Sequence, residues 1–504
     1  MTEDEIEEQI KAKRKADEFG FERVSDVSLW EHMDRLFSES GVELWEKGVI
    51  PSQASTNSFI AHANSKIIQT FLEEQSNTHS PKDDGPAYII ELGAGSGRFA
   101  YHFLQHFFGD DPQNPYIKNV VYVMNDIARI NIDFWKNHPQ FQPYVEAGLL
   151  DFCKHNVVSD ADIMLDISGE CLTTKSTQQP IALIANYVFD SIPVDFFAMQ
   201  DDALAEKLMI ISDMDEKAEF KTFIENLRFK WRTHPITMPY YKKPTWDKIL
   251  ERYEAIGGSF QFNLPVGAFK AIENLHRIFS GPMMVMVNDY GHISKESVSR
   301  VEAAVLNNNG NITSAVNFDA LGCFIENNGG ERLSFSGLFT EIASVGYILG
   351  SKPENTKKTR AAYQSYIEGF SPDNFMMLQN SWKNKNVEMT LAEAISFIKL
   401  AHYNSTSFLI CRASFLKACD VAVNTHNILL KETLVVIADS VMRFAYQFEG
   451  TYDPSLEVAQ MYMKLGHLPK ARKALEHGKH HHRKNKGLQI LLDRCAKLEQ
   501  VSAG

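Results

Sequence analysis

Three glycines at alternate positions follow an acidic side chain in the most informative stretch of this chain. Glu91 precedes Gly93, Gly95 and Gly97 in the segment PAYIIELGAGSGRFAYHFLQHFF. Glycine tolerates the backbone conformations of a tight turn and allows a ligand to approach the main chain closely. Where such a turn leads into a helix, the free N–H groups and the partial positive charge at the helix N-terminus favour an anionic group. The residue types and their spacing therefore predict a nucleotide-binding turn.

Two cofactor classes, dinucleotides and S-adenosylmethionine (SAM), could bind at such a turn. A dinucleotide fingerprint requires glycine where this chain has Arg98, which argues against a nicotinamide cofactor. Three glycines with the tighter G-x-G-x-G spacing, behind an acidic residue, are typical of SAM methyltransferases. The carboxylate of Glu91 suits a cofactor with an ammonium and a sulfonium, and it would not suit a pyrophosphate. An accidental glycine-rich turn without a ligand is the remaining interpretation.

Acidic residues also follow the apolar segments that we expect to form the next two strands. Asp126 closes the strand Val120–Asn125, at the position where nucleotide-binding folds hold the ribose hydroxyls. Asp151 follows the strand expected at Tyr144–Leu150. Its carboxylate would accept a hydrogen bond from the adenine amino group, or alternatively cap a helix.

The segment Asn186–Pro193, NYVFDSIP, follows a continuous apolar run, Pro180–Ala185, that is typical of a central parallel strand. Because ligands bind beyond the carboxyl ends of such strands, we expect this segment beside the reactive end of the cofactor. Asn186 offers an amide, Tyr187 a phenol and Asp190 a carboxylate. Asp190 is alternatively a helix cap, and Tyr187 is alternatively a packing residue.

The elements that must position these side chains alternate between strands and helices. Ala87–Leu92 is a short apolar run with strand character, and the phenylalanines that follow the glycines recur at helical spacing. We further expect a helix at Leu264–Phe279, a strand at Met283–Asn288 that ends at Asp289, and a short helix at Leu338–Tyr347. This alternation predicts an α/β fold with a nucleotide-binding βαβ unit.

The sequence predicts three regions. Residues 1–85 form a helical segment, in which the polar loop Pro51–Ser58 either covers the cofactor site or is a plain connector. Residues 86–352 form the sheet domain, with an insertion at about 200–262 that adds strands and an aromatic, proline-rich loop. Residues 353–504 have almost no strand signal and form an α-helical domain.

Within the helical domain, Ser455–Gly478 is similar to a tetratricopeptide helix pair. Because one such pair cannot bury its own faces, the preceding helices should stack against it. The domain would bind a protein partner or a second copy of this chain, or it is a helical bundle that only stabilises the enzyme. The histidines at His477 and His480–His482 lie among basic residues, so we expect a solvated basic helix end and no metal site.

Composition narrows the function classes. The 504 residues allow a large core and more than one domain. The net charge of −13 argues against non-specific binding of nucleic acid or of an anionic membrane. Six scattered cysteines without a Cys-x-x-Cys pair indicate reduced thiols rather than a disulfide or zinc framework. With no apolar run long enough to span a membrane and no signal or transit peptide, we expect a cytoplasmic protein.

Taken together and in this order, these motifs resemble the MidA-like family of SAM-dependent methyltransferases. The resemblance covers about two-thirds of the chain, from Ser28 to Gly350. Five segments match family motifs: Glu91–Gly97, Asn186–Pro193, Asp289–Gly291, Asn311–Phe318 and Gly337–Leu349. A mitochondrial member of the family is similar to a protein arginine methyltransferase that assists the assembly of respiratory complex I.

The resemblance implies a Rossmann-like class I methyltransferase sheet with inserted strands, and methyl transfer from SAM to a protein side chain, at arginine or another nitrogen. The residues that would bind the cofactor are Glu91, Gly93, Gly95, Gly97, Asp126, Asp151 and Asn186. Among the expected catalytic residues, Asp190 or Asp289 would orient the methyl acceptor or take its proton, and Tyr187 would line the acceptor channel.

Three positions differ from the family in a way that bears on the acceptor. Tyr187, Asn311 and Asn317 are neutral where the family has acidic residues. An arginine acceptor requires carboxylates to hold its guanidinium, and Asp190 and Asp289 are the remaining acids. A second hypothesis therefore stands beside the active methyltransferase: an assembly factor or scaffold that keeps the fold and has lost turnover. A nicotinamide enzyme on the same sheet is a third.

Overall fold

The computed structural model describes most of the chain. The described residues are 20–50, 55–78, 85–109, 117, 119–175, 177–212, 217–301, 306, 311–333, 342–385, 388–449, 451–479 and 486–503. Among these residues, no helix combines the length and hydrophobicity that crossing a bilayer requires.

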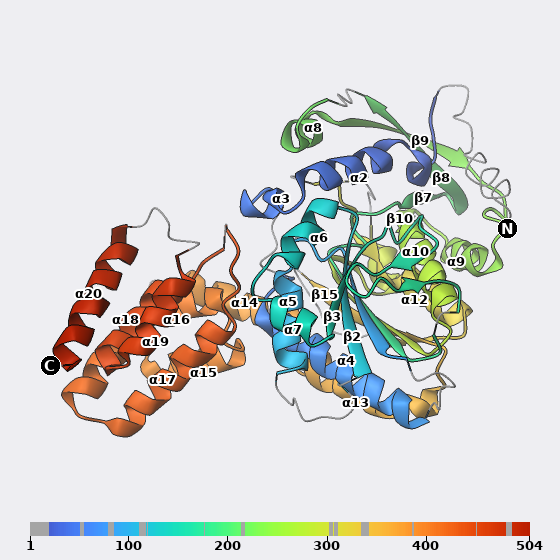
Figure 1. Ribbon diagram of the computed structural model, residues 1–504. Coiled ribbons are helices and arrows are strands. Elements are labelled where there is room, and N and C mark those ends of the chain that lie inside the picture. Colours follow the sequence, from blue (N-terminus) through green and yellow to red (C-terminus); the bar gives the residue numbers. More distant parts are fainter. Residues whose placement is uncertain are drawn as a thin grey trace.

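A seven-stranded sheet with the order β14-β15-β11-β6-β1-β2-β3 forms the centre of the molecule (Figure 1). Its strands are β1 (Ala87–Leu92), β2 (Val120–Asp126), β3 (Leu150–Lys154), β6 (Ile181–Asn186), β11 (Met283–Asp289), β14 (Glu331–Leu333) and β15 (Ala343–Leu349). Strands β3, β2, β1, β6 and β11 are parallel, and β15 runs antiparallel to both β11 and β14. The expected α/β class with a largely parallel sheet is confirmed.

The strand order reverses at β1, which pairs with β2 on one side and with β6 on the other. In sheets of this kind, the loops that leave the two strands at such a point diverge and open a crevice for ligands. Every residue of β1 and of β11 is buried, because helices cover both faces of the sheet.

The helices on the two faces come from different parts of the chain. One face is covered by α4 (Ser58–Thr78), α5 (Arg98–Phe107) and α13 (Lys357–Tyr363). The other face is covered by α9 (Pro244–Glu254), α10 (Val266–Ile278) and α12 (Phe318–Asn327). Shorter elements complete the sheet domain: α6 (Arg129–Lys136), α7 (Gln142–Glu146), α11 (Lys295–Val298), β4 (Ile163–Met164), β5 (Cys171–Leu172), β12 (Gly291–His292), β13 (Val316–Asn317), and helical turns at Pro353–Asn355 and Gln364–Glu368.

A second, antiparallel sheet is built largely from the insertion. It has the order β10-β7-β8-β9, with β7 (Asp195–Gln200), β8 (Ala203–Ser212), β9 (Arg228–Pro235) and β10 (Phe260–Leu264). The N-terminal elements η1 (Val24–Asp26), α2 (Leu29–Ser40) and α3 (Glu43–Glu46) lie along this sheet together with α8 (Phe220–Asn226), as Figure 1 shows.

A buried ion pair holds the N-terminal segment on the inserted sheet. Arg23 Nε lies 2.8 Å from Glu206 Oε1 and 3.7 Å from Asp195 Oδ2. Its guanidinium also lies 5.0 Å from the ring centroids of Tyr240 and Tyr241. Two carboxylates and two aromatic faces therefore compensate for the burial of this charge.

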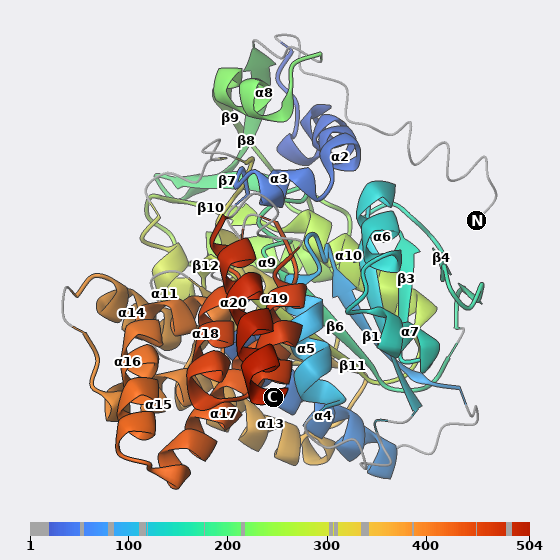
Figure 2. The same cartoon turned by 60° about the vertical axis from the view of Figure 1, so that its left-hand side comes forward.

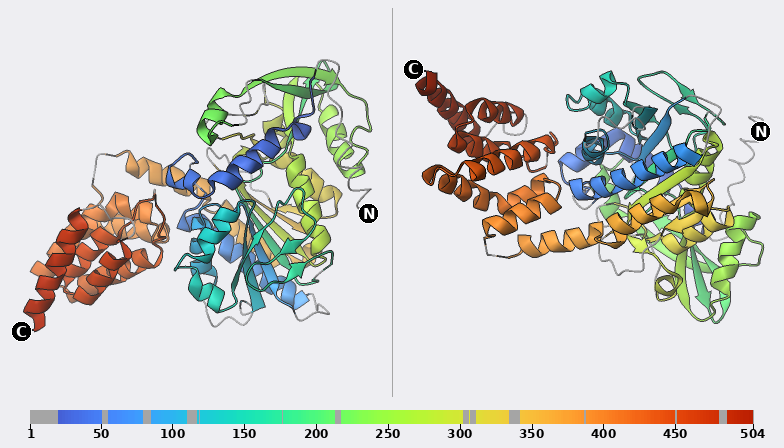
Figure 3. Two further views of the ribbon diagram at one scale, coloured as in Figure 1. Left: turned by 45° about the horizontal axis from the view of Figure 1, so that its top comes forward. Right: turned by 90° about the horizontal axis from the view of Figure 1, so that it is seen from below.

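After β15 the described part of the chain is helical, and its last seven helices form what we call the C-terminal helical array. These helices are α14 (Pro372–Lys383), α15 (Leu391–Leu400), α16 (Ser405–Asn424), α17 (Ile428–Arg443), α18 (Ser455–Leu465), α19 (Leu468–His477) and α20 (Lys486–Ala503). They pack around a core of their own. The array extends to one side of the sheet domain, joined to it through α14 (Figures 2 and 3).

The helix pair expected at Ser455–Gly478 is present as α18 and α19, and Gly466 between them adopts a left-handed conformation with φ of 84°. Its relation to tetratricopeptide repeats stays a prediction. The residues His480–His482 and Pro51–Ala54 lie outside the described part of the chain.

Two expected elements were wrong. The segment expected as the strand Tyr144–Leu150 contains the end of α7, and β3 begins only at Leu150, because Gly148 turns the chain with φ of 69°. The described end of the expected helix Leu338–Tyr347 is the antiparallel strand β15, whose seven residues are all buried between β11 and β14.

Candidate functional site

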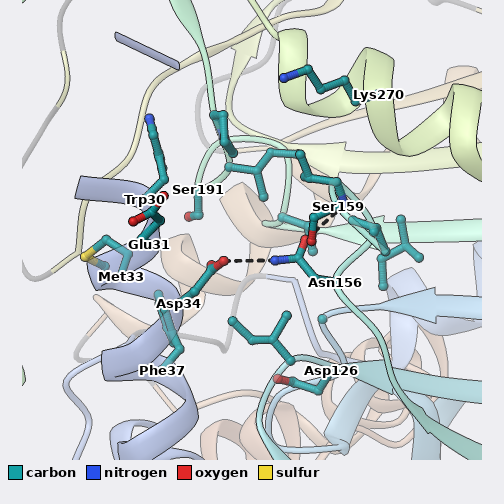
Figure 4. A pocket seen from close by; sticks show the side chains of 18 of the residues that line it. Trp30, Glu31, Met33, Asp34, Phe37, Asp126, Asn156, Ser159, Ser191 and Lys270 are labelled. Atoms are coloured by element: carbon teal, nitrogen blue, oxygen red, sulfur yellow. Dashed lines mark hydrogen bonds between the residues drawn. The ribbon is translucent and has the colours of Figure 1, made fainter. Parts of the chain in front are cut away.

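A cavity of about 540 Å³ opens where the sequence places the ligand, at the carboxyl ends of β1, β2 and β6. Its floor consists of the residues that follow these strands, among them Gly93, Asp126 and Tyr187. Its opposite wall is the helix α2, which contributes Trp30, Met33, Asp34 and Phe37 (Figure 4). The cavity therefore lies at the point where the strand order reverses, and its size falls in the usual range for small-molecule sites.

The three glycines form the predicted turn. Gly93, Gly95 and Gly97 have φ of 59°, 53° and 75°, a region that other residues rarely adopt. Gly93 lines the cavity. At Gly95, an added Cβ would lie 2.7 Å from Cζ2 of Trp45, a residue of α3. An indole therefore packs directly on the middle of the turn, and this contact has no counterpart in the sequence-based expectations.

Asp126 lies at the end of β2, at the cavity, and is 7% exposed. Its Oδ2 accepts a hydrogen bond from Gly95 N–H at 3.1 Å, and its Oδ1 accepts one from Ala128 N–H at 3.0 Å. Burial raises the pKa of this carboxyl, although these hydrogen bonds oppose the shift. The Ile127 N–H and the Asn131 side chain also hydrogen-bond to this carboxylate, so Asp126 borders the cavity while it holds the neighbouring turns in place.

Glu91 is 2% exposed and does not line the cavity. It lies within β1 and accepts a hydrogen bond from the Tyr122 hydroxyl at 2.9 Å. Burial raises the pKa of its carboxyl to about 8, and the nearby charge of Asp126 adds to the shift. At pH 7 this side chain is therefore mainly neutral, so it does not supply the negative charge expected for a cationic cofactor.

Asp151 is the second residue of β3, whereas we expected it to follow the strand. Its Oδ1 accepts from Ile167 N–H at 2.8 Å and its Oδ2 from Ser168 N–H at 3.0 Å. The carboxylate therefore fixes a neighbouring loop, and it lies outside the residues that line the cavity. The expected contact with adenine depended on the wrong bounds of this strand, so the geometry offers it no support.

Tyr187 lines the cavity from the turn that follows β6. Its backbone has φ of 51°, and its N–H donates to the carbonyl of Asn288 at 2.9 Å. Asn186 lies beneath it, and its Oδ1 accepts from Asn288 Nδ2 at 2.6 Å. A residue in this sparsely populated conformation persists only where its surroundings fix it, as they do here.

The two acids expected to act on the acceptor are buried beside the cavity and do not line it. The carboxylate of Asp289 accepts from the N–H groups of Phe189, Asp190 and Tyr290 at 3.1, 3.2 and 2.9 Å. Asp190 accepts from the Ser191 hydroxyl at 2.7 Å, and burial raises the pKa of its carboxyl to about 6. Asp289 therefore fixes the turn that carries Tyr187, as a structural group.

Besides Asn311, the polar groups that face the cavity include Asp34, Asn156 and Lys270, which the sequence did not single out. Asn156 Nδ2 donates to Asp34 Oδ2 at 2.9 Å across the cavity, as Figure 4 shows. On the far side Asn311 Nδ2 donates to the Ser191 hydroxyl at 3.3 Å. Lys270, on α10, contributes a cation at the upper end in Figure 4. In the sequence, α2 reads only as an amphipathic helix, so no local signal marks Asp34 as part of a site.

The cavity thus has an apolar aromatic wall, a carboxylate at the end of β2, and mixed polar groups around its rim. Such a site can hold a flat aromatic group together with hydroxyls and charged ends. Within the described residues, no group of three or more His, Cys, Asp or Glu side chains is arranged to bind a metal ion.

No protein-family model matches the chain, and no curated protein matches it. Two solved structures from Burkholderia thailandensis are similar in part. One, "an uncharacterized ACR, COG1565 superfamily protein", is 14% identical, with 66% of this chain and 79% of that chain covered and a TM-score of 0.38. The other, a "COG1565 superfamily member and likely methyl transferase" bound to S-adenosyl-homocysteine, is 14% identical, with 66% and 80% covered and a TM-score of 0.40. Similarity at this level places no ligand and no activity on this chain.

Proposed function

We propose that this protein is a SAM-dependent methyltransferase that binds its cofactor in the cavity beneath α2. One observation carries the proposal. The cavity lies where the strand order reverses, and both Gly93, the first glycine of the turn after β1, and the carboxylate after β2 border it. A glycine turn and an acid on adjacent strands are the two features that nucleotide-binding sheets use for the charged and ribose parts of a cofactor.

The residues present fit SAM in their chemistry. Gly93 offers close approach to the main chain, Asp126 places a carboxylate where the ribose would lie, and Ile127 with Val157 offers apolar contact for adenine. Because Glu91 lies within β1 and does not line the cavity, Asp34, which does, is the carboxylate better placed to interact with a cationic end of the cofactor. Burial raises the pKa of Asp34 to about 6, so it is mainly ionised at pH 7. When bound, SAM supplies an electrophilic methyl group on a sulfonium.

The residues of this chain would mainly orient the acceptor and exclude water. Tyr187 and Ser191 line the side of the cavity that follows β6, which is where we place the acceptor. The turn that carries them is fixed by Asp289, so the acceptor would meet a preorganised surface. We propose a protein side-chain nitrogen as the acceptor, in keeping with the resemblance to the MidA-like family. Removal of bulk water by α2 would favour transfer to that nitrogen over hydrolysis.

A binding experiment tests the cofactor assignment. Isothermal titration with S-adenosyl-homocysteine (SAH) should show one site in the wild-type protein. Asp126→Asn should weaken binding by at least about tenfold, because a hydrogen bond to a charged acceptor contributes roughly 1.5–3 kcal/mol. Asp133→Asn, at an exposed residue of α6, is the matched control and should bind as the wild type does. No binding to the wild type at high micromolar SAH would reject the proposal.

A scaffold that binds the cofactor without turnover is the second candidate, and one observation favours it. None of the acids expected to act on the acceptor faces the cavity, and Asn317, where the family has an acid, caps α12 through a hydrogen bond from Ala320 N–H at 2.9 Å. Labelled SAM incubated with the protein and a cell lysate distinguishes the two. Transfer of label to protein supports the enzyme, whereas cofactor binding with no transfer to any acceptor supports the scaffold.

A further inference from the structure

A tyrosine in the segment that joins α17 and α18 of the C-terminal helical array contacts the glycine turn. Tyr446 follows α17, and its hydroxyl donates a hydrogen bond to the carbonyl of Ser96 at 2.8 Å. Ser96 lies between Gly95 and Gly97, so this carbonyl belongs to the turn itself. Tyr446 is 6% exposed, which means that the bond is shielded from water and that the carbonyl would lose its partner without the hydroxyl.

The hydrogen bond acts on the peptide unit that closes the turn. The peptide between Ser96 and Gly97 is planar, so its carbonyl and its N–H are fixed together. Its N–H donates to the carbonyl of Ala94 at 2.9 Å. Tyr446 therefore binds the carbonyl of this peptide, while the N–H of the same peptide closes the turn onto Ala94. An added Cβ at Gly97 would lie 3.0 Å from the Tyr446 hydroxyl, so the tyrosine fits closely against the turn.

The tyrosine is itself held in place by the sheet domain. Its ring stacks on Tyr101 and His138, with centroid distances of 5.3 and 4.8 Å. On either side of it, Gln140 donates to the carbonyl of Ala445 at 2.9 Å and accepts from Gln447 N–H at 2.7 Å. The segment around Tyr446 is therefore fixed at the seam where the array meets the sheet domain, in contact with the glycine turn.

We propose that Tyr446 is a positioning residue of the cofactor site, so that the C-terminal helical array completes the site which the sheet domain begins. The inference rests on the proposed function, because it assigns the turn to cofactor binding. It gives the array a role at the site in addition to any partner that it binds. Loss of the hydroxyl frees the Ser96 carbonyl, and the glycine turn then samples conformations that do not bind the cofactor.

The test compares three tyrosine-to-phenylalanine variants of the full chain. Tyr446→Phe removes the bond to the turn. Tyr101→Phe removes a bond across the same seam, to the carbonyl of Arg443 at 2.7 Å, and Tyr462→Phe removes a bond within the array, to Asp439 at 2.7 Å. SAH affinity is measured by titration at a temperature at which all variants are folded. Hydrogen exchange of the 93–97 amides is measured without ligand.

Tyr446→Phe should weaken SAH binding about fivefold, as expected for one net hydrogen bond, and should accelerate exchange in the turn. The other two variants should leave both readouts at the wild-type value even where they lower thermal stability. Unchanged affinity in Tyr446→Phe, or an equal loss in Tyr101→Phe, would overturn the inference. If the wild type binds no SAH, the proposed function fails, and exchange in the free protein still reports whether Tyr446 fixes the turn.

Discussion

The buried carboxyl of Glu91 makes a specific prediction about stability and pH. The side chain is 2% exposed, and burial raises the pKa of its carboxyl from 4.5 to about 8 in the folded protein. In the unfolded chain the group ionises at its ordinary pKa. Between these two values the folded state binds the proton more tightly than the unfolded state does. The free energy of unfolding should therefore fall as pH rises through this window.

The magnitude follows from the two pKa values. Between about pH 5 and pH 8, this one group should lower the free energy of unfolding by roughly 3 kcal/mol. Glu91→Gln keeps the size of the side chain and an oxygen for the Tyr122 hydroxyl, and it cannot ionise. The variant should be about as stable as the wild type near pH 5, and more stable by roughly 3 kcal/mol near pH 8.

Urea unfolding followed by circular dichroism, at several pH values across this range, measures the difference. Glu146→Gln, at an exposed residue of α7, is the matched control, and its stability curve should parallel that of the wild type. A stability gain in Glu91→Gln that does not change with pH would refute the reasoning. It would show that the carboxyl is solvated in the folded protein, or that a neighbouring charge compensates for it.

Three further substitutions test other parts of the structure. Gly95→Ala should destabilise the protein by about 2–4 kcal/mol, because alanine is strained in the left-handed conformation and its Cβ would clash with the indole of Trp45. Gly148→Ala is the control, since an added Cβ there meets nothing within 4 Å. It should cost only about 1 kcal/mol in the same urea experiment. Arg23→Met should lower stability by about 3–5 kcal/mol in thermal unfolding, because Glu206 then loses the cation that compensates for its burial. A loss below 1 kcal/mol would contradict the burial of this pair. Asp289→Ala removes two hydrogen bonds from the turn that carries Tyr187, and one from Tyr290, so it should weaken SAH binding more than about tenfold while secondary structure by circular dichroism is retained. Unchanged affinity would show that the turn keeps its shape without the carboxylate.

The parts of the fold that the sequence predicts are those encoded within a few residues. The glycine turn and the acid after β2 follow from local spacing and from the rule that ligands bind beyond strand ends. The strand β15 was missed because a short buried apolar run has no periodicity that distinguishes a strand from a helix. It is a strand because it pairs with β11 and β14, and this information is not local.

The residues of the candidate site also divide into those that local spacing predicts and those that only tertiary packing brings there. Asp126 lies at the cavity, where spacing suggested it, whereas Glu91 and Asp151 satisfy hydrogen-bond donors elsewhere. Asp34 and Tyr446 could not have been found from sequence. Asp34 belongs to a helix that meets the cavity only through tertiary packing, and Tyr446 lies 350 positions from the carbonyl that it contacts.

The position of β15 has a consequence for the order in which a growing chain can complete its sheet. β11 and β14 are both synthesised before the strand that separates them, so neither can pair on that side until Ala343–Leu349 has left the ribosome. A nascent chain or a truncated product that stops before Ala343 exposes the backbone groups of a long apolar strand. Such an open edge is a template for association with other chains. Premature termination in this gene should therefore yield insoluble fragments rather than a smaller, soluble sheet domain.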